Sequence, residues 1–318
     1  MISTWIQAMR LRTLPLAVSG ILMGTALAEL SGYESDKFTT FLALLTAVLL
    51  QVLSNLANDY GDYIKGTDNE QRIGNMRALQ SGEITPKAML KAIVLFVVLC
   101  LITGIGLLLY AGDGKLNVSF VLFFLLGLAA IAAAIKYTIG KNAYGYSGLG
   151  DVFVFVFFGP VAVYGVYLLQ HRFSVNWDMD KWVLLPSCTL GLLSAAVLNT
   201  NNIRDITNDR ASGKRTIVVQ MGLQKARLYH WALIIIAALC LAVFLVMVRF
   251  HWIQFLSLAA FYPIFKQAAV VQQTPPSPAY NGLLKQLSIS ILLLVVAFMI
   301  MQTVALGIFV YTSINNFT

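Results

Sequence analysis

The sequence has few charged residues for its length. Of its 318 residues, 11% are Asp, Glu, Lys or Arg, whereas a soluble domain carries about 25%. Hydrophobic residues make up 58% of the chain, and the mean hydropathy is +0.77. This composition excludes an ordinary soluble domain and predicts an all-α polytopic membrane protein, because backbone groups in lipid must be hydrogen-bonded within the chain.

Cysteine and histidine are also scarce, with three of each. Cys100, Cys188 and Cys240 lie inside apolar runs without metal-type spacing, so we interpret them as buried small side chains. The histidines are scattered, and the sequence contains no paired His spacing and no evident Ser–His–Asp or Cys–His arrangement. These absences exclude the soft-ligand metal sites and the common nucleophilic triads.

Long apolar stretches account for most of the chain. A membrane-spanning helix needs about 20 mainly apolar residues, and nine stretches meet that requirement. They are residues 13–30, 38–60, 88–111, 117–135, 149–170, 181–200, 228–248, 251–271 and 288–313. Only Arg249 and Phe250 separate the seventh from the eighth.

Two polar clusters end the second and the sixth of these stretches, and they are near copies. Each runs Asn, carboxylate, carboxylate, glycine at almost equal spacing. The first contains Asn55, Asn58, Asp59, Asp62 and Gly66, and the second contains Asn201, Asn202, Asp205, Asp209 and Gly213. A charge at the centre of a membrane helix costs roughly 2.5–3.5 kcal/mol on insertion scales. Two matched sets therefore indicate one shared function.

The spacing within each cluster predicts a polar stripe on one helix face. Asn55 and Asp59 are four residues apart, as are Asp205 and Asp209, and such positions share a face. Close carboxylates repel each other unless a cation lies between them, and hard oxygen ligands favour Mg²⁺ or Ca²⁺. Because Mg²⁺ completes its shell with water and phosphate oxygens, two such half-sites facing each other would hold a diphosphate. The alternative is a set of solvated loop charges.

Basic residues accompany both clusters. We expect Lys65, Arg72, Arg77, Lys214 and Arg215 to bind the diphosphate. The cationic bias of cytoplasmic loops is the alternative explanation, and we prefer it for residues that open helices, namely Lys87, Lys225 and Arg227.

A third polar segment lies between the fourth and fifth stretches. It contains Lys136, Tyr137 and Thr138, followed by Tyr144 to Asp151. The tyrosines could line a cavity, where an aromatic face stabilises a cation, or they could anchor the chain at the membrane interface. Lys136 and Tyr137 are candidate substrate-binding residues.

The order of spans places both acidic clusters on the same side of the membrane. Four spans separate the clusters, which suggests an internal duplication of about 1–145 and 146–318 within a single domain of residues 1–318. With nine spans, 17 of the 22 Lys and Arg residues fall on that same side. The net charge of +8 therefore predicts a cytoplasmic orientation by the positive-inside rule, and not a nucleic-acid partner.

At these motifs the chain resembles the UbiA superfamily of intramembrane prenyltransferases. The segments that carry the resemblance are Asn55–Asp68, Arg77–Thr85, Tyr137–Asp151 and Asn201–Thr216. The run Asn201-Asn-Ile-Arg-Asp205 is similar to the branch that prenylates 1,4-dihydroxy-2-naphthoate in menaquinone synthesis. The branch acting on 4-hydroxybenzoate usually has a third Asp at the position of Gly66, whereas here the extra acid is Asp68. After Tyr137-Thr138 the chain departs from the Gly-Pro pattern of the naphthoate branch.

The resemblance implies a nine-helix bundle around a central cavity in the bacterial cytoplasmic (inner) membrane, open to the cytoplasmic side. It implies Mg²⁺ on Asp59, Asp62, Asp205 and Asp209, with Asp68 as a further possible ligand and the four asparagines in support. The implied reaction moves a polyprenyl group from its diphosphate to dihydroxynaphthoate, releasing CO₂ and diphosphate and giving demethylmenaquinol. Other aromatic acceptors, such as 4-hydroxybenzoate, and cation transport are the alternatives. Membrane lipids are the remaining expected partner, and prenyl length and oligomeric state stay open.

Overall fold

The computed structural model describes residues 2–32, 34–68, 73, 76–175, 177–248 and 251–315. These residues form helices and connections without a β-strand, and they include nine stretches long and apolar enough to span a membrane, as predicted. The spanning elements are α1 (Ile2–Met9) with η1 (Leu11–Thr13) and α2 (Leu14–Leu30), α3 (Lys37–Ile64), α4 (Pro86–Ala111), α5 (Val118–Lys136), α6 (Gly150–Val156) with η3 (Phe157–Tyr164) and α7 (Gly165–Gln170), α8 (Trp177–Arg204), α11 (Leu223–Val248), η4 (Trp252–Phe261) with α12 (Tyr262–Gln273), and α13 (Tyr280–Asn315). Three short elements lie in connections, namely η2 (Tyr144–Tyr146), α9 (Ile206–Ala211) and α10 (Ile217–Met221).

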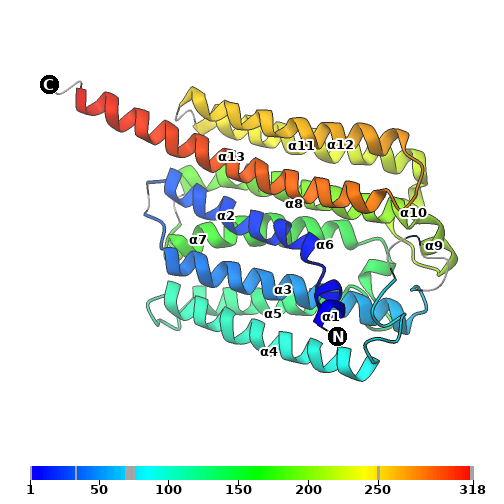
Figure 1. Ribbon diagram of the computed structural model, residues 1–318. Coiled ribbons are helices and arrows are strands. Elements are labelled where there is room, and N and C mark those ends of the chain that lie inside the picture. The colour runs from blue at the N-terminus through cyan, green and yellow to red at the C-terminus, as the bar shows by residue number, and fades with distance from the viewer. Residues whose placement is uncertain are drawn as a thin grey trace.

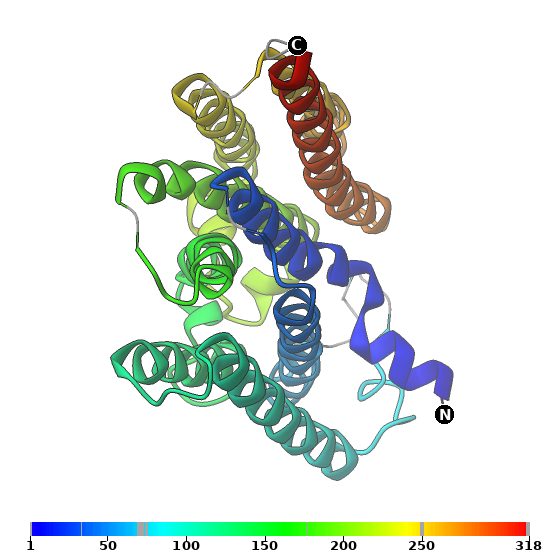
Figure 2. The same cartoon turned by 90° about the vertical axis from the view of Figure 1, so that its left-hand side faces the viewer.

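The long helices lie side by side, and α1, α9 and α10 gather toward one end of the bundle (Figure 1). Viewed from the opposite end, α4 and α5 lie on one side and α11 to α13 on the other, with α2, α3 and α8 between them (Figure 2). Helix α8 is the most enclosed of these spans, with 72% of the residues in its most apolar stretch buried, against 11% for α5. A large apolar core therefore joins α2, α8, α11, α12 and α13, and a second joins α1, α3 and α4.

The outer face of α4 is apolar and exposed. Leu90, Val94, Val98 and Ile102 recur every four residues and are each between 45% and 62% exposed. Water would disfavour such a continuous apolar stripe, whereas hydrocarbon accommodates it. The exposed stripe on α4 therefore fits a helix that faces lipid, as expected of an integral membrane protein.

Side-chain caps fix where several helices begin. Asp36, Thr85 and Asn117 each accept a hydrogen bond from the backbone N–H three residues later, at the starts of α3, α4 and α5. Each cap satisfies a backbone donor that the first helical turn leaves without a partner.

Two spans depart from regular α-helix. The fifth passes through the π-helical segment η3, which contains Pro160, a residue that cannot donate a backbone hydrogen bond. The eighth begins as the 3₁₀ helix η4. At Gly159, a Cβ atom would lie 2.5 Å from the carbonyl oxygen of Ser187 and 2.9 Å from Cα of Gly191. Glycine at both 159 and 191 thus lets η3 and α8 approach closely.

Candidate functional site

Each acidic cluster ends a helix with the same backbone turn. Gly66 (φ 69°) follows α3 and Gly213 (φ 74°) follows α9, and both adopt the left-handed conformation that favours glycine. The N–H of Thr67 donates to the carbonyl of Asp62 at 2.9 Å, and that of Lys214 donates to the carbonyl of Asp209 at 2.8 Å. This is the Schellman termination. The glycine that both motifs share therefore stops the helix just beyond an aspartate.

The second cluster does not lie on one continuous helix. Helix α8 ends at Arg204, Asp205 stands between helices, and α9 carries Asp209. The i to i−4 hydrogen bonds persist, from Asp205 N–H to the Asn201 carbonyl at 3.1 Å and from Asp209 N–H to the Asp205 carbonyl at 2.8 Å. The polar stripe predicted from the spacing is thus kept although the helix is interrupted.

Direct contacts join the two clusters. Lys214 Nζ lies 3.6 Å from Asp62 Oδ1, and the side-chain amide of Asn208 donates to the Thr67 carbonyl at 2.9 Å. Tyr146 donates to Asp62 Oδ1 at 2.8 Å, and its ring has Lys65 Nζ at 3.8 Å and Lys214 Nζ at 5.2 Å from its centroid. The clusters therefore share one end of the bundle.

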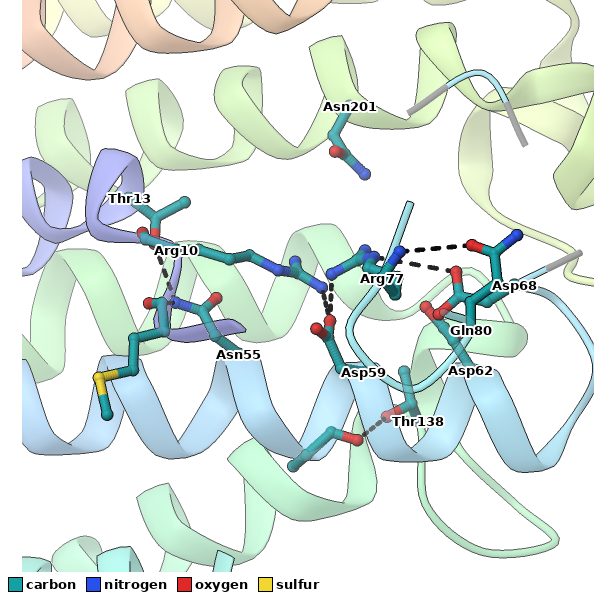
Figure 3. Close-up of polar contacts among 12 residues, drawn as sticks. Arg10, Thr13, Asn55, Asp59, Asp62, Asp68, Arg77, Gln80, Thr138 and Asn201 are labelled. Carbon is teal, nitrogen blue, oxygen red and sulfur yellow. Dashed lines mark hydrogen bonds and ion pairs between the residues drawn. The ribbon is translucent and has the colours of Figure 1, made fainter. Parts of the chain in front are cut away.

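Two arginines bind the same oxygen of Asp59. Arg10, from the junction of α1 and η1, and Arg77, from the connection before α4, both pair with Asp59 Oδ1 (Figure 3). Arg77 Nε also lies 3.9 Å from Asp68 Oδ1. Asn201 projects from α8 toward this pair (Figure 3). Asp59 is 1% exposed, so the arginines compensate a charge that burial would otherwise disfavour.

Arg204 performs a similar task for Asp205. Its Nε and Nη2 donate to Asp205 Oδ1 and Oδ2 at 2.8 and 2.6 Å, and its Nη1 donates to Asn281 Oδ1 of α13 at 2.7 Å. The Arg204 side chain is fully buried. This bidentate pair fixes the carboxylate plane of Asp205.

A cavity of about 400 Å³ extends from the clusters into the bundle. One face of α3 lines it from Asp62 to Ala43, a length of about 28 Å at 1.5 Å per residue. Its inner part is apolar and includes Ile21, Leu107 and Phe124. The site is therefore the polar end of a long apolar chamber.

The structure brings most of the predicted site residues to this chamber. Those that line it are Asn55, Asn58, Asp62, Asp68, Arg77, Tyr137, Asn201, Asp205, Asp209 and Lys214. Asp59 is held by the lining residues Arg10 and Arg77, Asn202 is buried in α8, and Lys65 is half-buried against Tyr146. Lys136 and Arg215 are exposed and are not among the lining residues that the structure describes. Arg72 lies outside the described residues.

Some residues at the site were not among the predicted site residues. Arg10 precedes the first span and looked like ordinary flanking charge, while Tyr146 was considered only as one of several tyrosines that could line a cavity. Asn208 could have been found, because it precedes Asp209 as Asn58 precedes Asp59.

The charged side chains at this end of the bundle influence one another's pKa values. Burial, together with the nearby Asp205 and Asp62 carboxylates, raises the pKa of Asp209 to about 7, although Lys214 opposes the rise. Burial alone would lower the pKa of Lys214, but Asp62 and Asp209 more than offset this and raise it above its ordinary range. The site thus holds a stable cation beside a carboxylate that readily takes up a proton.

The donor set fits Mg²⁺. Among the described residues, no three His, Cys, Asp or Glu side chains converge into a complete metal site, and Mg²⁺ usually takes only one or two carboxylates and completes its shell with water and substrate phosphates. Within the same part of the chain, the buried Oδ1 atoms of Asn58 and Asn208 have no hydrogen-bond partner. These oxygens are hard acceptors that a hydrated cation could satisfy.

Comparison with known proteins gives concordant matches. The model of the UbiA prenyltransferase family matches residues 17–289. The chain is 46% identical over 240 residues to a 1,4-dihydroxy-2-naphthoate octaprenyltransferase of Escherichia coli (strain K12), covering 76% of this chain and 75% of that protein. It is 40% identical over 296 residues to the protein of the same name in Haemophilus influenzae, covering 92% and 94%.

Solved structures share the fold at low sequence identity. A UbiA homolog from Aeropyrum pernix K1 superposes with a TM-score of 0.64 at 16% identity, covering 92% of this chain and 97% of that one. A UbiA homolog from Archaeoglobus fulgidus bound to DMAPP and Mg²⁺ gives 0.58 at 18% identity, covering 92% and 99%. From the family match and the two close relatives, we conclude that the chain belongs to the UbiA prenyltransferase family.

Proposed function

We propose that this protein transfers a polyprenyl group from its allylic diphosphate to 1,4-dihydroxy-2-naphthoate in a Mg²⁺-dependent reaction. The observation that carries the proposal is the convergence of the two acidic clusters, through the Lys214–Asp62 and Asn208–Thr67 contacts, at the polar end of an apolar cavity. The names of the two relatives above support the choice of acceptor.

The polar end suits a diphosphate with its metal. Asp59, Asp62, Asp205 and Asp209 would hold Mg²⁺, with Asp68 near enough to Arg77 to take part in the same network. When bound, the metal supplies positive charge that stabilises the leaving diphosphate. Lys214 and Arg77 line the same space and would bind phosphate oxygens directly.

The apolar chamber suits the rest of the donor. Its lining is mainly apolar, with many Leu, Ile, Val, Ala and Phe side chains that suit a prenyl chain and disfavour water around it. The C1–O bond of the allylic diphosphate breaks with its electron pair leaving on oxygen, and the electron-rich ring supplies the pair for the new C–C bond. Attack at the carboxyl-bearing carbon followed by loss of CO₂ restores the aromatic ring without removal of a ring proton.

We place the site on the cytoplasmic side of the bacterial inner membrane. The loops at the site end carry most of the positive charge of the chain, including Arg10, Arg77 and Lys214. This distribution follows the positive-inside rule.

The direct test is product mass. Purified protein in lipid, supplied with Mg²⁺, a prenyl diphosphate and dihydroxynaphthoate, should form a prenylated product lacking CO₂. Omission of Mg²⁺, Asp59→Asn or Asp205→Asn should each abolish its formation while the protein remains folded in the membrane. A lack of product with naphthoate but formation with 4-hydroxybenzoate would reassign the acceptor. Uptake of Mg²⁺ into liposomes without prenyl transfer would instead favour a transporter.

A further inference from the structure

The cavity wall carries a small polar patch that begins at Asn55, the innermost residue of the first cluster, and continues deeper into the cavity. It consists of Thr13 from η1 and of Gln51 and Asn55 from α3, all of which line the cavity. Gln51 lies eight residues before Asp59, about 12 Å deeper along the helix. A ring that attacks C1 of the donor must lie deeper in the cavity than the diphosphate. This wall therefore adjoins the expected position of the acceptor.

Hydrogen bonds fix the orientation of the Gln51 amide. The Thr13 hydroxyl donates to the Arg10 carbonyl at 2.9 Å, and therefore it can only accept from Asn55 Nδ2 at 3.0 Å and from Gln51 Nε2 at 3.3 Å. Asn55 Nδ2 also donates to the Met9 carbonyl at 2.9 Å, which leaves Asn55 Oδ1 to accept from Gln51 Nε2 at 3.3 Å. A flipped Gln51 amide would lose both of its bonds.

This network leaves one buried acceptor without a donor. Gln51 is 9% exposed, and in the part of the chain that the structure describes its Oε1 has no hydrogen-bond partner. The same holds for Nε of Arg10, which also lines the cavity and whose side chain runs from the Thr13 end of this wall toward Asp59 (Figure 3). Buried polar atoms are normally paired, so an amide oxygen and a guanidinium N–H left over at one cavity wall indicate a ligand that offers a hydroxyl and an acid group.

We propose that Gln51 is the residue that recognises a ring hydroxyl of the aromatic acceptor, and that Arg10, on the same cavity wall, binds the acceptor's carboxylate. The proposal rests on the function proposed above and assigns the wall of Thr13, Gln51 and Asn55 to a hydroxylated aromatic acid. A bare amide oxygen accepts a hydroxyl but rejects an ether or a hydrogen at the same place, because these leave the oxygen without a donor.

The test combines one substitution with acceptor analogues. In Gln51→Met the half-saturating concentration of dihydroxynaphthoate should rise about tenfold, the scale of one hydrogen bond, while the value for the prenyl diphosphate stays unchanged. Inhibition constants are then measured for 1-hydroxy-2-naphthoate and 4-hydroxy-2-naphthoate. For the analogue that lacks the recognised hydroxyl, wild type and Gln51→Met should bind alike.

Thr103→Val is the control. Thr103 lies on α4 and is absent from the described cavity lining, and its hydroxyl donates at 2.9 Å to the Leu99 carbonyl of its own helix, so acceptor kinetics should not change. An unchanged acceptor response in Gln51→Met would overturn the inference, and so would equal weakening of both analogues, which would indicate only a structural role. Absence of naphthoate turnover in the wild type would instead refute the proposed function.

Discussion

Lys214 offers a test of how the site stabilises a leaving group. The residue is 8% exposed, and its Nζ lies 3.6 Å from Asp62 Oδ1. At an effective dielectric constant of about 20, this separation corresponds to about 4–5 kcal/mol of attraction. Lys214→Met keeps much of the side-chain length but removes the charge. We expect kcat to fall about 10²- to 10³-fold, the usual effect of deleting one group that stabilises transition-state charge.

The affinity for Mg²⁺ should move the other way. Removing a cation from beside Asp62 leaves the site more negative, so the half-saturating Mg²⁺ concentration should stay the same or fall. Lys65→Met is the matched control, because Lys65 stacks on the same Tyr146 ring at 3.8 Å yet is absent from the described cavity lining. Steady-state rates with Mg²⁺ titration measure both quantities. A kcat within threefold of wild type, or equal losses in both variants, would refute this role.

Three further outcomes follow from the geometry. Because the pKa of Asp209 is raised to about 7, protons should compete with Mg²⁺ below that pH, weakening apparent affinity up to about tenfold per unit, and Asp209→Asn should remove this pH dependence. In Gly61→Ala the new Cβ would lie 2.4 Å from Thr138 Oγ1. The protein should therefore lose about 1–3 kcal/mol of stability, which a lower melting temperature in detergent would show. Tyr146→Phe keeps the ring but loses the 2.8 Å hydrogen bond that holds the Asp62 carboxylate in position. Because Asp62 is then less well oriented for the metal, the half-saturating Mg²⁺ concentration in a titration should rise about tenfold.

The sequence determines the membrane spans well because hydropathy over about 20 residues is a strong signal. All nine predicted stretches correspond to helical spans. Arg249 and Phe250, the predicted boundary between the seventh and eighth, lie outside the described residues, but α11 ends at Val248 and η4 begins at Trp252. The errors lie at helix ends. The sixth span was expected at 181–200 but α8 covers Trp177–Arg204, because its polar last turn is helical without being apolar.

Long-range pairing was harder to predict than the motifs themselves. The asparagine and aspartate spacing identified both clusters, but it gave no sign that Arg10 and Arg77 would meet on one oxygen of Asp59. These residues are 49 and 18 positions from Asp59, and only the packing of α1 and of the connection before α4 brings them together. The roles of the individual site residues and the internal duplication stay predictions.

The arginine pair on Asp59 also bears on how the chain enters the membrane during synthesis. The second cluster, which supplies Lys214 to Asp62, is made more than 100 residues after the first, with Asn208 lying 141 residues beyond Thr67. Arg10 and Arg77 both belong to the early part of the chain. The first half can therefore neutralise Asp59 before the second half is synthesised. The partly inserted chain then carries no unpaired charge at this position before α8 is made.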